Sequence, residues 1–172
     1  RAARAALIEA IGLQSRPPDE WIVVDGGSTD GSEALARVCP LVDVFVPGPD
    51  RGIYDAWNKG IEHARGRWVV FAGVGDALEP EWIRRLAAEP DDVGFVYGDL
   101  LLVAEDGVVR RIPARAWPDA CARLGDGLTI PHVGTGHARR LFERERFDDS
   151  LRVLADWDFV LRMRGEGGRR LP

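Results

Sequence analysis

The first segment whose residues could bind a ligand is VVDGGSTDGS, residues 23–32. The Asp25 carboxylate can accept hydrogen bonds from a base or a ribose, and the glycines after it let a ligand approach the backbone closely. We assign Asp25, Gly26 and Ser28 to such a binding site. The same residues also suit an ordinary junction between a strand and a helix, with Asp30 as the helix cap.

A second acid, Asp76, ends the segment FAGVGD at residues 71–76. An acid at the tip of a buried strand can hold Mg²⁺ or Mn²⁺ together with substrate phosphates, because magnesium needs only one or two protein carboxylates. The alternative is a turn aspartate that caps the helix near Glu79. His132, in the Pro- and Gly-containing segment 130–135, is either a ligand or a hydrogen-bonded loop residue.

A third pair of acids, Asp156 and Asp158, alternates with aromatic residues in LADWDF, residues 154–159. A carboxylate at the start of a helix can act as a general base that takes a proton from a sugar hydroxyl. Acids are also favoured in the first turn of any helix, because they complement the helix dipole. The spacing alone leaves both interpretations open.

The helix expected at residues 53–65 carries Asp55, Asn58 and Glu62 along one stripe, opposite its apolar side. A solvated helix face explains this stripe, above all for Glu62. We keep Asp55 and Asn58 as candidate ligand-binding residues.

The elements that position these residues follow from the apolar periodicity. Strands alternate with helices through the first hundred residues, which indicates a mostly parallel sheet with right-handed crossovers and an antiparallel portion after residue 95. Ligands of such sheets bind beyond the carboxyl ends of the strands, where the loops of Asp25 and Asp76 should converge. The predicted strands are residues 21–24, 42–46, 68–72, 95–97, 100–103 and 108–112, the last two joined by a hairpin turn at 105–107. The predicted helices are residues 2–14, 31–38, 53–65, 79–88, 139–144 and 156–164, and residues 113–131 resist assignment.

Composition narrows the classes of protein. The 172 residues carry a net charge of -5, which argues against a nucleic-acid polymer as partner but allows a small phosphorylated ligand with a divalent cation. The two cysteines provide neither a disulfide framework nor a zinc site. No apolar run approaches the roughly 20 residues of a membrane span. We expect a cytoplasmic location and leave contact with the inner face of the membrane open.

Taken in order, these motifs resemble the family-2 glycosyltransferases, particularly bacterial ones of the exopolysaccharide and colanic-acid type. The matching segments are VVDGGSTDGS (23–32), PDRGIYDAWNKGIEHARGRWVVFAGVGDAL (49–78), VYGDL (96–100), IPHVGTGHARRLF (130–142) and LADWDFVLRM (154–163). The resemblance implies an α/β, GT-A fold with a mostly parallel sheet flanked by helices. It also implies that residues 1–172 form a single catalytic domain, truncated at both ends, without the family's first strand and its C-terminal acceptor region.

The resemblance further implies a reaction: a sugar passes from a nucleotide-diphosphate sugar to a saccharide or lipid-linked acceptor in one displacement that inverts the anomeric centre. Asp156 would deprotonate the acceptor hydroxyl. Asp25 would contact the base or ribose of the donor, and Asp55 and Asn58 would belong to the donor site. Asp76 would hold Mg²⁺ or Mn²⁺, a Lewis acid for the departing diphosphate. His132, which matches a family histidine, is the second metal candidate.

Two other functions remain open. A sugar-nucleotide nucleotidyltransferase also uses an α/β sheet and Mg²⁺, but the segment 154–163 has no obvious place in it. A non-catalytic binding or scaffold domain would account for Gly75, Ala155 and Val133, which stand where the family commonly has other residues.

Overall fold

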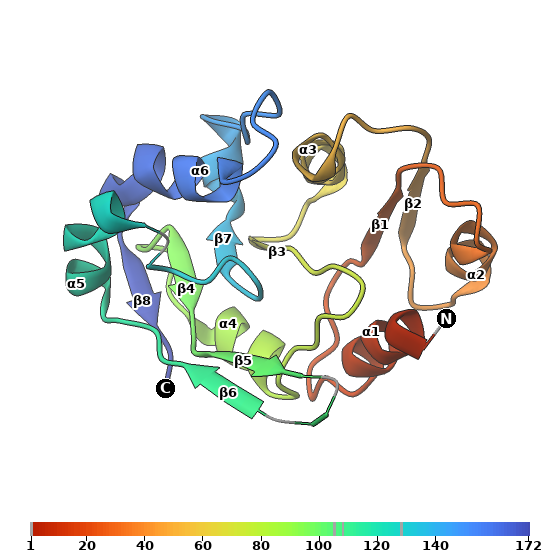
Figure 1. Ribbon diagram of the computed structural model, residues 1–172, viewed down its shortest axis with the longest axis horizontal. Coiled ribbons are helices and arrows are strands. Elements are labelled where there is room, and N and C mark those ends of the chain that lie inside the picture. Colours follow the sequence, from red (N-terminus) through yellow and green to blue (C-terminus); the bar gives the residue numbers. More distant parts are fainter. Residues whose placement is uncertain (1, 105, 108, 128) are drawn as a thin grey trace.

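The computed structural model describes residues 2–172 except 105, 108 and 128 (Figure 1). Residues 105 and 108, which belong to the predicted hairpin turn and to the predicted strand after it, lie outside the described residues. The helices are α1 (Ala2–Gly12), α2 (Ser32–Val38), α3 (Ile53–His63), α4 (Trp82–Ala88), α5 (Trp117–Ala122) and α6 (Ala155–Met163). The strands are β1 (Ile22–Asp25), β2 (Val44–Pro47), β3 (Trp68–Val70), β4 (Phe95–Tyr97), β5 (Leu100–Val103), β6 (Val109–Ile112), β7 (Gly136–Ala138) and β8 (Gly168–Arg170).

The predicted elements of the first hundred residues are all present, with ends shifted by a few residues. The predicted helix at 139–144 is instead a 3₁₀ helix, Arg139–Glu143. Among the described residues, the elements that were not predicted are α5, within the segment that resisted assignment, the strands β7 and β8, and the 3₁₀ turns Leu124–Asp126 and Arg164–Glu166. Both strands have three residues and contain glycine, so they carry no apolar run; β7 pairs with β3 and β4, and β8 pairs with β4.

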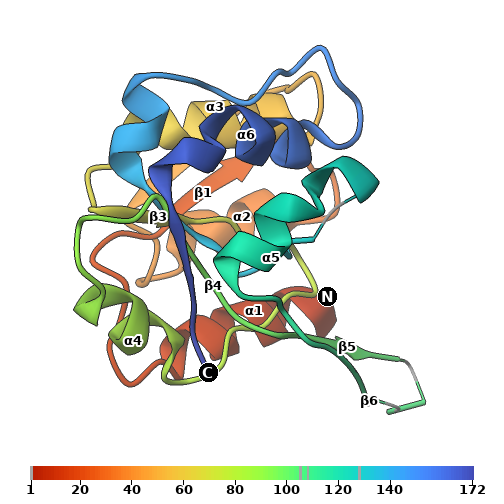
Figure 2. The same cartoon turned by 90° about the vertical axis from the view of Figure 1, so that its left-hand side faces the viewer.

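The strands form three sheets. β1 pairs in parallel with β2, with Ile22 opposite Val44. The larger sheet has the order β3-β7-β4-β8, in which β4 and β8 are parallel while β7 runs antiparallel to both β3 and β4. Three of its four strands therefore share one direction, as expected of a mostly parallel sheet, and the antiparallel β7 lies in the antiparallel portion expected after residue 95. β5 and β6 form an antiparallel hairpin that projects from the body of the molecule (Figure 2).

An apolar cavity of about 740 Å³ lies between β1 and β3, which are not paired with each other among the described residues. Consecutive residues of both strands line it. Since side chains alternate between the faces of a strand, a cavity lined by consecutive residues follows the strand edges. Helix α3 lies across this space and packs on β1 (Figure 1). The expected absence of the family's first strand remains a prediction.

The hydrophobic core is centred on β4 and the helices that cover it. Phe95 and Tyr97 of β4 are almost fully buried, as are Leu141 and Phe159. The rings of Phe159 and Phe142 stack with centroids 4.9 Å apart. Burying one such side chain contributes about 1.5–3 kcal/mol. This packing anchors α6, which carries Asp156, to the larger sheet.

The close approach of β8 to α5 gives a first prediction. A Cβ atom at Gly168 would lie 2.1 Å from Cε3 of the Trp117 ring, which stacks on Phe95. We expect Gly168→Ala to lower the free energy of unfolding by about 1–3 kcal/mol, because the ring has to move in a packed core. Urea denaturation measures the difference. The control is Gly165→Ala, whose Cβ would meet nothing within 4 Å and which should change stability by less than about 0.5 kcal/mol. Equal effects of the two substitutions would contradict the packing described here.

Candidate functional site

The loop after β1 is ordered by the carboxylate of Asp25. Oδ1 of this residue accepts hydrogen bonds from the N–H groups of Gly27 (2.9 Å) and Ser28 (2.6 Å). Burial opposes ionisation of Asp25, but the hydrogen bonds from Ser28 and Gly27 outweigh it and hold the pKa of the carboxyl below its usual value. Asp25 is therefore an anion in a preorganised turn at the carboxyl end of a strand.

The absence of a side chain at Gly26 allows the loop after β2 to lie close to the turn that Asp25 orders. A Cβ atom at Gly26 would lie only 2.1 Å from Oδ2 of Asp50, a residue of the loop after β2. The other oxygen of Asp50 accepts the N–H of Gly52 at 3.0 Å. Two carboxylates, Asp25 and Asp50, thus stand on adjoining loops. Asp50 was not among the predicted site residues, although it lies in the segment 49–78 that carries the strongest resemblance.

The loop after β3 ends at Asp76 and is closed in a similar way. Oδ2 of the half-buried Asp76 accepts the N–H of Gly73 at 2.7 Å, and the N–H of Asp76 donates to the Gly73 carbonyl at 3.0 Å. Gly75 has φ 103°, a left-handed conformation that favours glycine, so an acid at this position would be strained. Gly73 and Val74 line the same cavity as Asp25, Gly26 and Ser28. Both loops therefore border one cavity, which Asp76 itself does not line.

His132 lies in an aromatic cluster at the end of β3. Its ring stacks on Trp57 (4.3 Å between centroids) and on Phe71 (5.5 Å). Burial lowers the pKa of His132 to about 4, so the imidazole is neutral near pH 7. Within the described part of the chain, its buried Nε2 atom has no hydrogen-bond partner. His137 beside it is also neutral, since burial lowers its pKa to about 3, and its Nδ1 lies 3.0 Å from the Thr135 carbonyl.

Among the residues that the structure describes, no group of three or more His, Cys, Asp and Glu side chains is placed to hold a metal ion. A neutral imidazole can ligate a metal, and so can a single carboxylate that shares the ion with phosphates and water. The metal assignments of Asp76 and His132 remain predictions, and no contact joins the two residues.

Asp156 lies in the first turn of α6, where the structure separates it from its neighbouring acid. Oδ2 of Asp158 pairs with the Arg162 guanidinium at 2.8 Å. Oδ1 of the half-buried Asp156 instead accepts the phenol O–H of Tyr54 at 3.1 Å. Asp158 thus has a cationic partner, whereas the side chain that contacts Asp156 is a neutral phenol. Of the two acids, Asp156 is the one that is not paired with Arg162 of its own helix.

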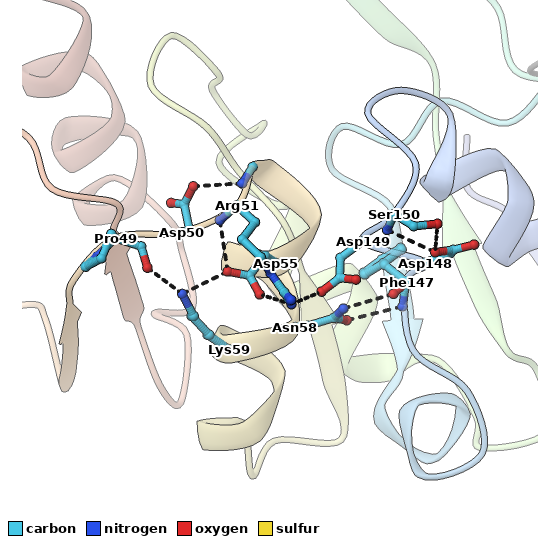
Figure 3. A network of polar contacts seen from close by, with 11 residues as sticks. Pro49, Asp50, Arg51, Asp55, Asn58, Lys59, Phe147, Asp148, Asp149 and Ser150 are labelled. Atoms are coloured by element: carbon cyan, nitrogen blue, oxygen red, sulfur yellow. Dashed lines mark hydrogen bonds and ion pairs between the residues drawn. The ribbon is translucent and has the colours of Figure 1, made fainter.

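Asp55 is held inside a network of charges on α3 (Figure 3). Its carboxylate pairs with Lys59 Nζ (2.9 Å) and with the Arg51 guanidinium (2.9 Å), and it accepts the Arg51 N–H at 3.1 Å. These partners, Lys59 first and then Arg51, hold the pKa of Asp55 well below its usual value.

Asn58, one turn further along α3, is held by the backbone of Phe147. Its Nδ2 donates to the Phe147 carbonyl at 2.9 Å, and its Oδ1 accepts the Phe147 N–H at 3.2 Å (Figure 3). Neither Asn58 nor Asp55 lines the cavity that Asp25 and Gly73 share. Asp25, Gly26 and Ser28 thus line the same cavity as Gly73 and Val74 of the Asp76 loop, and Asp55 and Asn58 are held in internal contacts. Their assignment to the donor site remains a prediction.

Solved structures of TarS from S. aureus have the same fold. The complex of TarS residues 1–349 with UDP has a TM-score of 0.76 at 18% identity, over 98% of this chain and 53% of that one. The complex with UDP-GlcNAc has a TM-score of 0.75 at 17% identity, over 97% and 51%. The expected GT-A fold is confirmed, and it defines the class of protein.

Sequence comparison identifies the family within that class. The sequence model described as glycosyl transferase family 2 matches residues 5–149. The chain is 33% identical over 180 residues to the PGL/p-HBAD biosynthesis glycosyltransferase of Mycobacterium tuberculosis (strain ATCC 25177 / H37Ra), covering 94% of this chain and 64% of the relative. It is 30% identical over 184 residues to the succinoglycan biosynthesis protein ExoO of Rhizobium meliloti (strain 1021), covering 94% and 52%. The chain belongs to glycosyltransferase family 2 and spans 52–64% of the length of these two relatives.

No helix in the described part of the chain combines the length and the apolar character needed to cross a membrane.

The charge network of α3 predicts a pH dependence. The pKa of Asp55 is lower in the folded protein than in the unfolded chain, where it is about 4. Its carboxylate therefore stabilises the fold at pH 7, and this contribution is lost as the pH falls from about 5 towards 2. We expect Asp55→Asn to lower the urea midpoint at pH 7 and to reduce the drop in midpoint between pH 7 and pH 3. Glu62→Gln, an exposed change on the same helix, should keep the parent's pH dependence. An unchanged drop in Asp55→Asn would refute the role of this network.

Proposed function

We propose that this chain contributes the donor site and the general base of an inverting, metal-dependent sugar transfer. The donor is a nucleotide-diphosphate sugar, and the acceptor is a hydroxyl group of a saccharide or lipid-linked acceptor in the synthesis of a cell-surface polysaccharide. The observation that carries the proposal is the contrast at the start of α6: Asp158 has a cationic partner in Arg162, while the side chain that contacts Asp156 is a neutral phenol. The expected cytoplasmic location belongs to this proposal, since the donor is a nucleotide sugar.

The donor end of the site is assigned to the loops after β1 and β3. Anionic Asp25, in a turn ordered by its own hydrogen bonds, would accept hydrogen bonds from the base or ribose. Gly26 and Ser28 line the same cavity and leave backbone groups accessible. The solved complexes of TarS with UDP and UDP-GlcNAc support a donor of this chemical class.

The residues present fit a divalent metal at one position. The Asp76 carboxylate stands at the end of β3 with one oxygen bonded to the Gly73 amide, so its other oxygen could join phosphate and water oxygens around Mg²⁺ or Mn²⁺. Such an ion would supply Lewis-acid stabilisation of the departing diphosphate.

Asp156 acts as the general base in the chemical step. Its carboxylate takes the proton of the acceptor hydroxyl, whose oxygen forms a bond to the anomeric carbon. The bond from that carbon to the diphosphate oxygen breaks, and the nucleoside diphosphate leaves with the bonding electrons. Because a single displacement occurs on the face opposite the leaving group, the configuration at the anomeric carbon is inverted.

Nucleotide binding tests the donor assignment. We expect calorimetric titration of the full chain to show binding of either UDP or GDP that strengthens at least tenfold with Mn²⁺, because the ion offsets repulsion between the acids and the diphosphate. Asp76→Ala should abolish the effect of Mn²⁺, while the nearby Glu79→Ala should keep it. A folded protein that binds neither nucleotide would favour the scaffold interpretation.

Turnover tests the base. We expect Asp156→Asn to lower the transfer rate by about 10²–10⁴-fold without weakening nucleotide binding, because an amide cannot accept the hydroxyl proton. Asp158→Asn, two residues along the same helix, should change the rate by only a few-fold. The reverse ranking of the two variants would move the base to Asp158, and a parent protein without turnover would leave only a binding function.

A further inference from the structure

Helix α3 contacts the segment that leads into α6 at three successive places. Arg51, just before the helix, pairs with Asp149, and the two side chains point towards each other in Figure 3. Asn58 binds the backbone of Phe147 through both polar atoms of its side-chain amide, Nδ2 and Oδ1. Tyr54, between them in sequence, donates its hydroxyl to Asp156. We call Arg51, Tyr54 and Asn58 the α3 clasp.

The hydroxyl of Tyr54 is placed by the packing of its ring. Tyr54 is only 7% exposed, and its ring lies edge-on to Trp57 with centroids 5.2 Å apart and 6.0 Å from Phe147. Burial first, and then the charge of Asp156, raises the pKa of Tyr54, so its oxygen keeps the proton that it donates. The hydroxyl of Tyr54 therefore stays at one position and remains a hydrogen-bond donor throughout the physiological range of pH.

The other two contacts of the clasp hold the segment opposite Tyr54. Asp55 orients the Arg51 guanidinium at 2.9 Å, which presents it to Asp149. Asn58 forms hydrogen bonds with both the N–H and the carbonyl of Phe147. Removal of the Asn58 side chain would leave this backbone donor and acceptor unpaired. These contacts involve elements 89–98 residues apart in the chain, so they set the spacing between α3 and the start of α6.

The start of α6 needs such support. Leu154, two residues before Asp156, has φ 65°, and among the described residues it is the one non-glycine residue with positive φ. A conformation of this kind costs on the order of 1–3 kcal/mol and persists only where surrounding contacts impose it. Phe159 anchors the far side of the helix turn in the core, while the clasp acts on the side of Asp156.

We propose that Tyr54 is a positioning residue for Asp156, and the proposal rests on the function proposed above. By binding Oδ1, the hydroxyl of Tyr54 fixes the rotation of the carboxylate and leaves Oδ2 to take the proton of the acceptor hydroxyl. Arg51 and Asn58 hold the two elements at the spacing that this hydrogen bond requires. The competing explanation is a structural hydrogen bond that only satisfies a buried phenol.

Kinetics of Tyr54→Phe separate the two explanations. The variant keeps the ring and its packing but loses the hydrogen bond. We expect kcat to fall about tenfold, with the KM values of donor and acceptor within twofold of the parent, because a poorly oriented base slows the chemical step alone. The matched control is Tyr97→Phe, which removes the hydroxyl of another buried tyrosine, bonded to the Arg115 carbonyl at 2.9 Å. Tyr97→Phe should cost comparable stability and leave kcat unchanged. Equal kcat losses in both variants, or an unchanged kcat in Tyr54→Phe, would overturn the proposal.

A double-mutant cycle shows whether Tyr54 acts through Asp156. In the Asp156→Asn background, Tyr54→Phe should cause no further loss of kcat, because the group that it positions is already absent. The same tenfold loss in both backgrounds would mean that Tyr54 acts independently of Asp156. The Asp156→Asn protein also separates the two levels of the argument: if it keeps the parent's kcat, the base assigned in the proposed function is wrong, whatever Tyr54 does.

Discussion

The packing of α3 against β1 on one side and against the aromatic cluster around Phe147 on the other is the constraint on which the remaining structure depends. On one side the helix approaches β1 at Gly60, where an added Cβ would already be in van der Waals contact with Val24. On the other side Trp57 enters the aromatic cluster and Asn58 holds Phe147. Since β1 and β3 are not paired with each other among the described residues, these helix contacts carry much of the connection between the two sheets. The position of the proposed donor loops relative to Asp156, the proposed base, thus depends on one helix.

Ionisable side chains on α3 and in the neighbouring aromatic cluster are stabilised in different ways. The buried carboxylate of Asp55 is compensated by two cations, Arg51 and Lys59. The buried histidines carry no compensating partner and are neutral, because desolvation lowers the pKa of His132 and His137 far below pH 7. Burying a charge is costly unless it is paired, so these are the two stable outcomes. Asp156, at the edge of this region, accepts a hydrogen bond from the neutral hydroxyl of Tyr54.

The loops after β1 and β3 share one local hydrogen-bonding arrangement. In each, an aspartate carboxylate accepts backbone N–H groups of its own turn: Gly27 and Ser28 for Asp25, and Gly73 for Asp76. These bonds order the loops without a ligand, so less conformational entropy would be lost on binding. The glycines within the turns then allow close approach, as the contact between Gly26 and the Asp50 carboxylate shows.

The sequence by itself determined the elements of the first hundred residues, because short apolar runs and helical periodicity are local properties of the chain. It also determined that Asp25 and the loop of Asp76 lie at the carboxyl ends of two strands, and that Asp156 lies at the start of a helix. Only the tertiary structure decided that β7 runs antiparallel between β3 and β4. The tertiary structure also decided that Tyr54 meets Asp156 across 102 residues. Contacts of this range depend on how whole elements pack, and no local pattern records them.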